Sequence, residues 1–343
     1  MNETPQIDSG PPPGLVDLAA GRSGGGVLLA NDEFFAPKEN LIKPGRGVFV
    51  PDKYTDRGKW MDGWETRRRR TPGHDWCIVR LGVPGIIRHV DIDTNHFLGN
   101  HPPAASLDAV SLEGDSAKNL PSLEMAKWAG IIPQSPINPG SQNLFDVSDL
   151  RRWTHVRLNI FPDGGVARLR IYGTVVPDWT RYPAETLVDL AAIENGGVAL
   201  ACSDMFFSSM NNLIMPGAPL NMGDGWETKR RRGPGNDWII LQLGAAGIVK
   251  KIEVDTTHFK GNYPDRCSVE GCYLSDRRRQ AITDLQIVWK EVLSNSKLAA
   301  NTRHVFEREL SEAGPITHVR LNIYPDGGVG RLRLWGVRSP SNA

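Results

Sequence analysis

The stretch THVRLNIFPDGGVARLRIYG at residues 154–173 returns at residues 317–336 as THVRLNIYPDGGVGRLRLWG. In each copy, two short runs alternate apolar and polar residues with the period of two that is typical of a half-buried β-strand. The Pro-Asp-Gly-Gly segment between the runs favours a turn, and we expect it to join them as a hairpin. The chain is therefore predicted to consist of two copies of a β-rich unit.

Shorter blocks repeat in the same order in both copies. LVDLAA at residues 15–20 returns at residues 187–192, a displacement of 172. The block DGWET begins at Asp62 and again at Asp224, so its displacement is only 162. The first copy therefore carries about ten extra residues within 46–61, and we expect them to form a loop that the second copy lacks.

These displacements define the expected domains, which are two tandem jelly-roll β-sandwiches. Runs of five to nine residues rich in Ile, Val and Leu, separated by Gly, Pro, Asn and Asp, predict a mainly β fold class. Helical periodicity is visible only at residues 183–193 and 146–152. The expected segments are a disordered N-terminal segment, the first sandwich, a linker, the second sandwich and a short tail, at residues 1–13, 14–175, 176–185, 186–338 and 339–343.

The composition excludes several classes of protein. Forty Lys and Arg against 39 Asp and Glu leave a net charge of +1, which argues against a nucleic-acid or membrane partner. No apolar run is long enough to span a membrane. The four cysteines form no Cys-x-x-Cys pair, and no N-terminal stretch resembles a secretion signal. We therefore expect a cytoplasmic protein with reduced thiols.

The repeated motifs resemble those of the allantoicase family. The resemblance is carried by the doubled DGWET, the arginine run followed by GHDW, DTNHFLGN with DTTHFKGN, and the paired VRLNI(F/Y)PDGG, and it covers residues 15–338. It implies a hydrolase of purine degradation that converts allantoate and water to ureidoglycolate and urea. It also implies a fold similar to galactose-binding, discoidin-like domains. The jelly-roll pattern alone would suit a non-catalytic tandem carbohydrate-binding module, which is the alternative.

Acid and base chemistry is expected from acidic and histidine side chains near the repeated blocks. Releasing urea breaks a carbon–nitrogen bond, so one group must protonate the leaving nitrogen and another must take a proton from water. The predicted catalytic residues are Glu65, His74, Asp75 and His96. Asp75 could instead pair with an arginine, and His96 could instead bond to the backbone of the turn in which it lies.

Arginine is expected to hold the carboxylate of the substrate, because its planar guanidinium donates two parallel hydrogen bonds. The run RRRR at residues 67–70 and the run KRRR at residues 229–232 offer such side chains. A solvated charged face, or pairing with nearby acids, is the alternative for these runs. The predicted substrate-binding residues are Arg67, Arg68, Arg69, Asn100, His101, Arg157, Glu227, His258 and Arg320.

Differences between the copies favour one productive site in or beside the first repeat. Asn236 stands where the first copy has His74, and Tyr263 stands where it has His101. No cofactor is expected, and none of the histidines has the spacing of a zinc motif. A divalent metal held by His74, His96 and His101 is left open as an alternative. We also expect a homo-oligomer, as for many metabolic enzymes.

Overall fold

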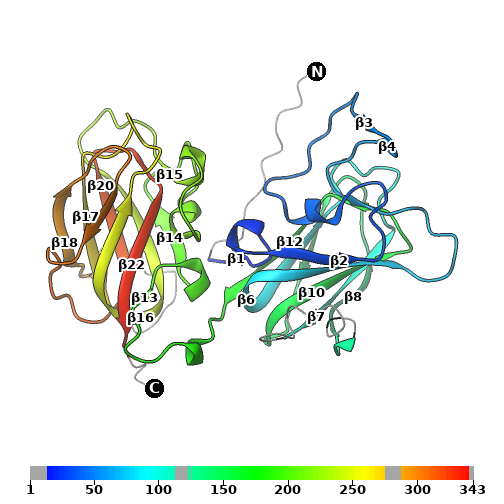
Figure 1. Ribbon diagram of the computed structural model, residues 1–343, viewed down its shortest axis with the longest axis horizontal. Coiled ribbons are helices and arrows are strands. Elements are labelled where there is room, and N and C mark those ends of the chain that lie inside the picture. The colour runs from blue at the N-terminus through cyan, green and yellow to red at the C-terminus, as the bar shows by residue number, and fades with distance from the viewer. Residues whose placement is uncertain (1–13, 113–122, 124, 275–286, 340–343) are drawn as a thin grey trace. The chain divides into compact units, whose positions relative to one another are not determined.

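The computed structural model describes residues 14–112, 123, 125–274 and 287–339. The segments expected at 1–13 and, apart from Ser339, at 339–343 therefore lie outside the described residues. The chain divides into two compact units, with the boundary between Val176 and Pro177. Each unit consists almost entirely of antiparallel strands (Figure 1), so the prediction of a mainly β, tandem fold is confirmed.

The first unit contains one eight-stranded sheet, folded into a sandwich, and two short strand pairs. Its path of neighbouring strands is β1-β12-β6-β10-β7-β8, with β2 and β9 also paired to β6. The strands of this sheet are β1 (Val16–Asp17), β2 (Gly26–Ala30), β6 (Asp75–Asp93), β7 (Ala104–Val110), β8 (Ala129–Pro136), β9 (Gln142–Asp146), β10 (Arg152–Phe161) and β12 (Arg168–Val175). The short elements are β3 (Tyr54–Thr55), β4 (Gly58–Lys59), β5 (Trp64–Glu65), β11 (Gly165–Val166), η1 (Gly21–Ser23), η2 (Lys38–Ile42) and η4 (Trp179–Arg181), the last of which begins the second unit.

Strand β6 organises the sandwich because its two halves have different neighbours. Residues 75–80 pair with β10 and β2, whereas most of residues 85–93 pair with β12 and β9. The 19-residue strand can therefore take part in both layers. Alternate side chains of β6 and β10, such as Val79 and Leu158, are fully buried and form part of the core.

The Pro-Asp-Gly-Gly segment does not form the expected hairpin, and that prediction was wrong. Strands β10 and β12 run on either side of β6 and pair with it instead of with each other. The segment therefore carries the chain across from one neighbour of β6 to the other. The short strand β11 lies on this crossing and pairs with β5.

The second unit repeats this architecture in the order β13-β22-β16-β20-β17-β18, with β14 and β19 paired to β16. Its strands are β13 (Val188–Asp189), β14 (Val198–Cys202), β15 (Trp226–Glu227), β16 (Asp237–Asp255), β17 (Arg266–Cys272), β18 (Lys290–Lys297), β19 (Arg303–Phe306), β20 (Ile316–Tyr324), β21 (Gly328–Val329) and β22 (Arg331–Arg338). Its further short helices are η5 (Ile193–Asn195), η6 (Met210–Ile214) and η7 (Met222–Asp224).

Neither segment with helical periodicity forms an α-helix, so those predictions were wrong. Residues 183–193 contain strand β13 and the start of η5, and residues 147–151 carry no regular element. Leu190, Ala191 and Ala192 are consecutive buried residues, which a one-sided amphipathic helix would not allow. The Asp189 carboxylate instead accepts the backbone N–H groups of Ala191 and Leu334, which fixes an extended strand and turn.

The extra residues of the first repeat form a long loop with a small hairpin of β3 and β4. Both strands of the hairpin are exposed. The start of the loop is fixed to the sandwich, because Arg46 pairs with Asp93 at 2.8 Å and Asn95 Nδ2 donates to Gly47 O at 2.9 Å. Asp62 Oδ2 accepts the Val48 N–H at 3.0 Å, so the two ends of the insertion are tied together.

Candidate active site

A cavity of about 340 Å³ lies in the first unit where the insertion meets the turn after β6. Three residues predicted for the active site line it, namely Glu65, His96 and Asn100. The insertion contributes Phe49 and Lys59 to the wall. The cavity therefore combines an acid, an imidazole, an amide and an amine, and its volume is sufficient for a small metabolite.

Glu65 is placed by backbone pairing on both sides of β5. It pairs with Gly165 of β11, and it forms an isolated bridge with Ala36. Asn100 Nδ2 donates a hydrogen bond to Glu65 Oε1 at 2.7 Å. Burial raises the pKa of the Glu65 carboxyl, and this effect exceeds the opposing one of the Asn100 bond. Glu65 can therefore keep its proton at a higher pH than an exposed glutamate.

His96 lies in a tight turn whose geometry is set by Phe97. The Phe97 side chain is fully buried, and its ring packs so closely on Gly165 that a Cβ there would lie 2.0 Å from the ring. His96 has a φ of 66°, in the left-handed region that non-glycine residues rarely adopt. Such strained positions cluster at functional sites. The turn thereby holds the imidazole at the cavity while Phe97 fills the core below it.

The insertion covers this region of the cavity. The Phe49 ring stacks on His96 with centroids 5.5 Å apart, and Lys59 Nζ lies 4.4 Å from the centre of the Phe49 ring. Arg57 Nη1 donates to Phe34 O at 2.8 Å and holds the hairpin against the sandwich. The sequence analysis identified the insertion as a difference between the repeats, but Lys59 and Phe49 were not among the predicted site residues.

His74 and Asp75 do not line the cavity. The His74 ring lies 4.6 Å from the Phe161 ring. Asp75 is 2% exposed, and its carboxylate accepts hydrogen bonds from Arg69 Nη1 and Asn31 Nδ2, each at 2.9 Å. This arrangement matches the alternative of a structural acid paired with an arginine.

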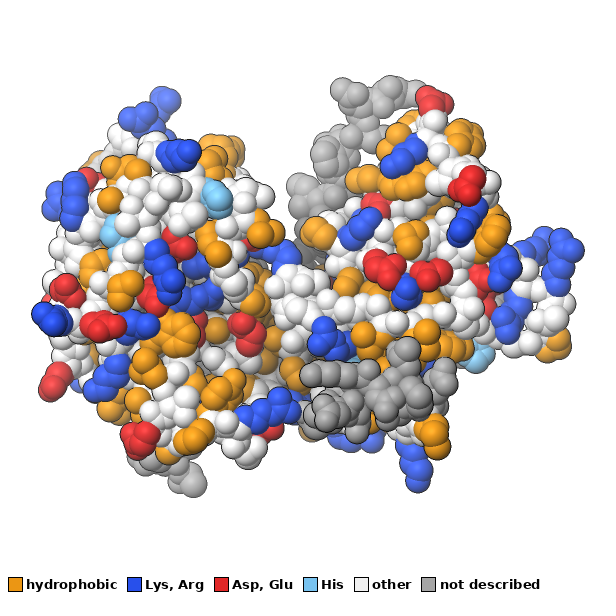
Figure 2. Space-filling model, in the orientation of Figure 1, with side chains coloured by type: hydrophobic (Ala, Val, Ile, Leu, Met, Phe, Trp, Pro, Cys, Tyr) orange, Lys and Arg blue, Asp and Glu red, His pale blue; other side chains and the backbone are white. Residues whose placement is uncertain are grey.

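The arginine run is also held outside the cavity. Arg67 pairs with Asp32 at 2.7 Å, and Arg69 pairs with Asp75 at 2.9 Å. Arg68 is exposed, and none of the three lines the cavity. On the face of the molecule in Figure 2, basic and acidic side chains alternate over most of the surface, and several basic ones gather at the right-hand edge of the view.

Arg157 and Arg320 occupy equivalent places on β10 and β20. Arg157 pairs with Asp108 at 2.8 Å, and Arg320 pairs with Glu270 at 2.7 Å. Each guanidinium also lies over a tryptophan ring. His101 follows Asn100 but does not line the cavity, and its Nδ1 atom is buried without a hydrogen bond. These three predicted binding residues therefore do not line the Glu65 cavity.

The second unit repeats the core of the arrangement without the cover. Glu227 lies on β15 at the position of Glu65, and Asn262 Nδ2 donates to its Oε1. His258 also has a positive φ, 74°, but its Nε2 lies 2.9 Å from Pro219 O. Phe207, the counterpart of Phe35, is 62% exposed against 37%. The insertion is present only beside Glu65, but Glu227 is buried as well, at 9% exposure, and Glu65 is half-buried.

Among residues 14–112, 123, 125–274 and 287–339, no three His, Cys, Asp or Glu side chains are grouped as a metal site. All four cysteines are free. Within the same described ranges, no helix is long and apolar enough to cross a membrane.

A family model, curated relatives and a solved structure all indicate the same family. The family model described as the Allantoicase repeat matches residues 16–176 and again residues 188–339. A probable allantoicase of Burkholderia mallei is 50% identical over 94% of both chains, and an allantoicase of Dictyostelium discoideum is 50% identical over 93% of this chain and 86% of its own. The crystal structure of allantoicase from Saccharomyces cerevisiae, 39% identical, superposes with a TM-score of 0.79 and covers 94% of this chain and 93% of that one. The chain therefore belongs to the allantoicase family, and it carries two copies of the repeat.

Proposed function

We propose that the chain hydrolyses allantoate to ureidoglycolate and urea, as expected of an allantoicase, and that the reaction takes place in the Glu65 cavity. Two observations support this location. Glu65, Asn100 and His96 line one cavity, and the insertion, which contributes Phe49 and Lys59 to its wall, is present only in the first repeat. The shared cavity is the observation that carries the assignment, and the raised pKa of Glu65 agrees with it, because acids with shifted pKa values are concentrated at catalytic sites.

Glu65 is assigned the role of general acid. In the reaction, the bond between the central carbon of allantoate and one ureido nitrogen breaks. The hydroxyl of water is added to that carbon, and a proton is added to the departing nitrogen. A buried carboxyl that retains its proton can supply it to urea nitrogen, and the Asn100 amide orients the Glu65 carboxyl for this transfer.

His96 and Lys59 are assigned the two remaining roles. The His96 imidazole can accept the proton of water, because a neutral imidazole carries one ring nitrogen without a hydrogen. The Lys59 ammonium, held over Phe49, can bind the carboxylate of allantoate. Lysine therefore takes the part that the sequence analysis assigned to arginine. We keep Glu227 and His258 as candidates for a second binding position in the other repeat.

The decisive experiment uses the paired acids of the two repeats. Purified protein is incubated with allantoate and the release of urea is measured for the wild type, Glu65→Gln and Glu227→Gln. The proposal expects a loss of about 10²- to 10⁴-fold in kcat for Glu65→Gln, which is the usual contribution of a general acid. Glu227→Gln is expected to retain most of the activity. No urea from the wild type would exclude the reaction, and the reverse order of the variants would move the site to the second repeat.

The proposed partner is a small-molecule substrate rather than a nucleic acid. Asp32 and Asp75 pair with two arginines of the first run, and Asp204 and Asp237 pair with Lys229 and Arg231 of the second. This pairing leaves little unbalanced charge for phosphate groups. We further propose that the protein works in the cytoplasm, which suits its free thiols, and that it forms a homo-oligomer.

A further inference from the structure

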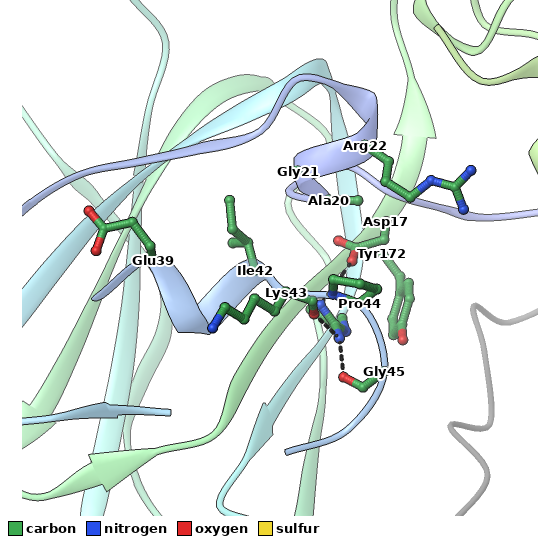
Figure 3. Close-up of a pocket in the computed structure, with 11 residues that line it drawn as sticks. Asp17, Ala20, Gly21, Arg22, Glu39, Ile42, Lys43, Pro44, Gly45 and Tyr172 are labelled. Carbon is green, nitrogen blue, oxygen red and sulfur yellow. Dashed lines mark hydrogen bonds and ion pairs between the residues drawn. The ribbon is translucent and has the colours of Figure 1, made fainter. Parts of the chain in front are cut away.

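A second cavity of the first unit lies between η1, the end of η2 and the last strand β12. Its volume is about 430 Å³. Figure 3 shows Ala20, Ile42, Pro44 and Tyr172 around it, and the side chains of Arg22 and Lys43 extend in opposite directions in this view. The walls are thus largely apolar, whereas two cations lie at the rim. Such a combination suits a small organic anion better than an inorganic ion, because the apolar walls can bury a carbon body.

Two acids, Asp17 and Glu39, line this cavity, and both have partners within the fold. Lys38 Nζ lies 2.8 Å from Glu39 Oε1. Asp17 Oδ1 accepts the N–H groups of Ala19 at 3.1 Å and Ile171 at 3.2 Å. Arg170 Nη1 lies 3.8 Å from Asp17 Oδ2, and Arg170 Nη2 donates to the carbonyl oxygens of Lys43 and Gly45 (Figure 3). The charge of Asp17 is therefore balanced by groups of the fold itself.

The second unit supplies an internal comparison. An equivalent cavity, of about 630 Å³, has the same frame of an aspartate on the first strand and an arginine and an aromatic ring on the last: Asp189, Arg333 and Trp335. Its rim differs, because Glu194 stands at the position of Arg22. At the position of Lys43 stands Met215, with almost the same backbone angles, φ −67° and ψ 153° against φ −60° and ψ 149°. The two cations are therefore features of the first cavity alone.

We propose that the cavity beside Lys43 is a binding site for a small organic carboxylate, distinct from the Glu65 cavity. Lys43 binds the carboxylate group, Arg22 adds a second positive charge, and Ile42, Pro44 and Tyr172 contact the carbon body. Lys43 Nζ lies 3.9 Å from Asp62 Oδ1, a long ion pair, and its side chain is 51% exposed. The ammonium can therefore turn to an incoming carboxylate with little loss.

This site is connected to the candidate active site through Asp62. The same carboxylate that faces Lys43 accepts the Val48 N–H, and Val48 precedes Phe49 in the insertion. A ligand that attracts Lys43 changes the charge next to this anchor. Occupancy is therefore expected to alter the rate of allantoate hydrolysis, and this last consequence rests on the proposed function.

The binding test uses benzoate, benzamide and inorganic phosphate, titrated by calorimetry. The protein carries Lys59→Met, so that the cation of the Glu65 cavity cannot bind the probe. Benzoate is expected to bind at millimolar concentration. Benzamide should bind at least about tenfold more weakly because it lacks the charge, and phosphate should bind at least about tenfold more weakly because it lacks the carbon body. Adding Lys43→Met, which installs the residue of the second repeat, should weaken benzoate about tenfold, and Met215→Lys should not.

The outcomes separate this proposal from the proposed function. Absence of benzoate binding, or binding unchanged by Lys43→Met, overturns the site. Phosphate binding as strongly as benzoate overturns the carbon-body assignment. Loss of allantoate hydrolysis in Glu65→Gln with benzoate binding intact leaves both assignments standing. Urea release is also measured with benzoate in the enzyme that keeps Lys59. If the effect of benzoate persists in Lys43→Met, benzoate acts at the Glu65 cavity, and the proposed connection between the two cavities is contradicted.

Discussion

Phe49 lies against His96 with an interplanar angle of 26° and ring centroids 5.5 Å apart. The two rings come from segments with different origins: Phe49 belongs to the insertion of the first repeat, and His96 belongs to the turn after β6 that both repeats possess. In this stack, the insertion that is unique to the first repeat contacts a histidine that has a counterpart, His258, in the second repeat. Removing it tests whether the insertion converts a structural turn into an active site.

Phe49→Ala is expected to lower kcat/KM for allantoate about tenfold, with the folded structure intact. The reason is that the imidazole loses its stacking partner and water enters the cavity, so the reacting groups are held less well. The measurement is urea release over a range of allantoate concentrations. Tyr54→Ala is the control, because Tyr54 lies in the same insertion but is 65% exposed and does not line the cavity. Equal loss in both variants would contradict a specific role for Phe49.

Lys59→Met should raise KM by about tenfold or more and leave the unfolding temperature unchanged. The ammonium is exposed on the hairpin and is assigned to the carboxylate of the substrate, so its loss removes one charge-assisted hydrogen bond. Lys59→Arg should recover part of the affinity. Lys53→Met is the matched control, since Lys53 lies over Trp60 of the same insertion. A normal KM in Lys59→Met would show that another group holds the carboxylate.

The repeats made the fold predictable, but not the pairing of its strands. Alternating residues in both copies of the VRLNI block identified strands, and two β-sandwiches followed from the displacements. The hairpin at Pro-Asp-Gly-Gly was wrong because turn residues report a local change of direction, whereas the partner of a strand is decided by distant segments. Here β6 lies between β10 and β12 and pairs with both, so these two strands cannot pair with each other.

The site shows the same limit. Glu65, His96 and Asn100 could be selected from the sequence because each lies in a block present in both repeats. Lys59 and Phe49 have no counterpart for comparison, so no pattern pointed to them. His74 and Asp75 were selected by type and proximity in sequence to the arginine run. The fold directs Asp75 to Arg69 and His74 to Phe161 instead. Their predicted catalytic role is the part of the site with least support from the geometry.

Asp189 gives a pH test of stability in the second repeat. Burial raises the pKa of its carboxyl from an ordinary 3.8 to about 6. Because the folded state then binds the proton more tightly than the unfolded state, the stabilising effect is complete below the ordinary pKa and is lost as the pH rises through about 6. A shift of this size corresponds to about 3 kcal/mol.

The measurement is the free energy of unfolding in guanidinium for the wild type and Asp189→Asn, at an acidic pH and at a mildly alkaline pH. The advantage of the wild type over the variant should shrink as the pH rises, since asparagine does not ionise. Glu185→Gln, which replaces an exposed acid that does not act on Asp189, should show no such trend. A wild-type advantage that grows with pH would show that the Arg333 partner outweighs burial.

The last prediction concerns Asp62, whose pKa moves in the opposite direction. Burial acts to raise the pKa of this carboxyl, but the hydrogen bonds from Arg168 and Val48 outweigh it and lower the pKa. Its stabilising effect is therefore present at neutral pH and is lost on acidification below the ordinary range. Arg168 Nη2 lies 2.6 Å from Asp62 Oδ2, and Arg168 is only 2% exposed.

Asp62→Asn should cost about 3 kcal/mol of unfolding free energy, because it leaves the buried Arg168 without its counter-ion. Asp224→Asn provides the matched comparison, since Asp224 accepts Arg331 at 2.8 Å and the Leu220 N–H at 2.9 Å in the second repeat. Both variants should lose similar stability. Only Asp62→Asn should also lower kcat/KM, measured well below the unfolding temperature of the variant, because Asp62, unlike Asp224, accepts a backbone N–H of the insertion beside Glu65. If Asp62→Asn were less stable yet kept wild-type kcat/KM, the anchor would have no part in the chemistry, and the insertion would need another explanation.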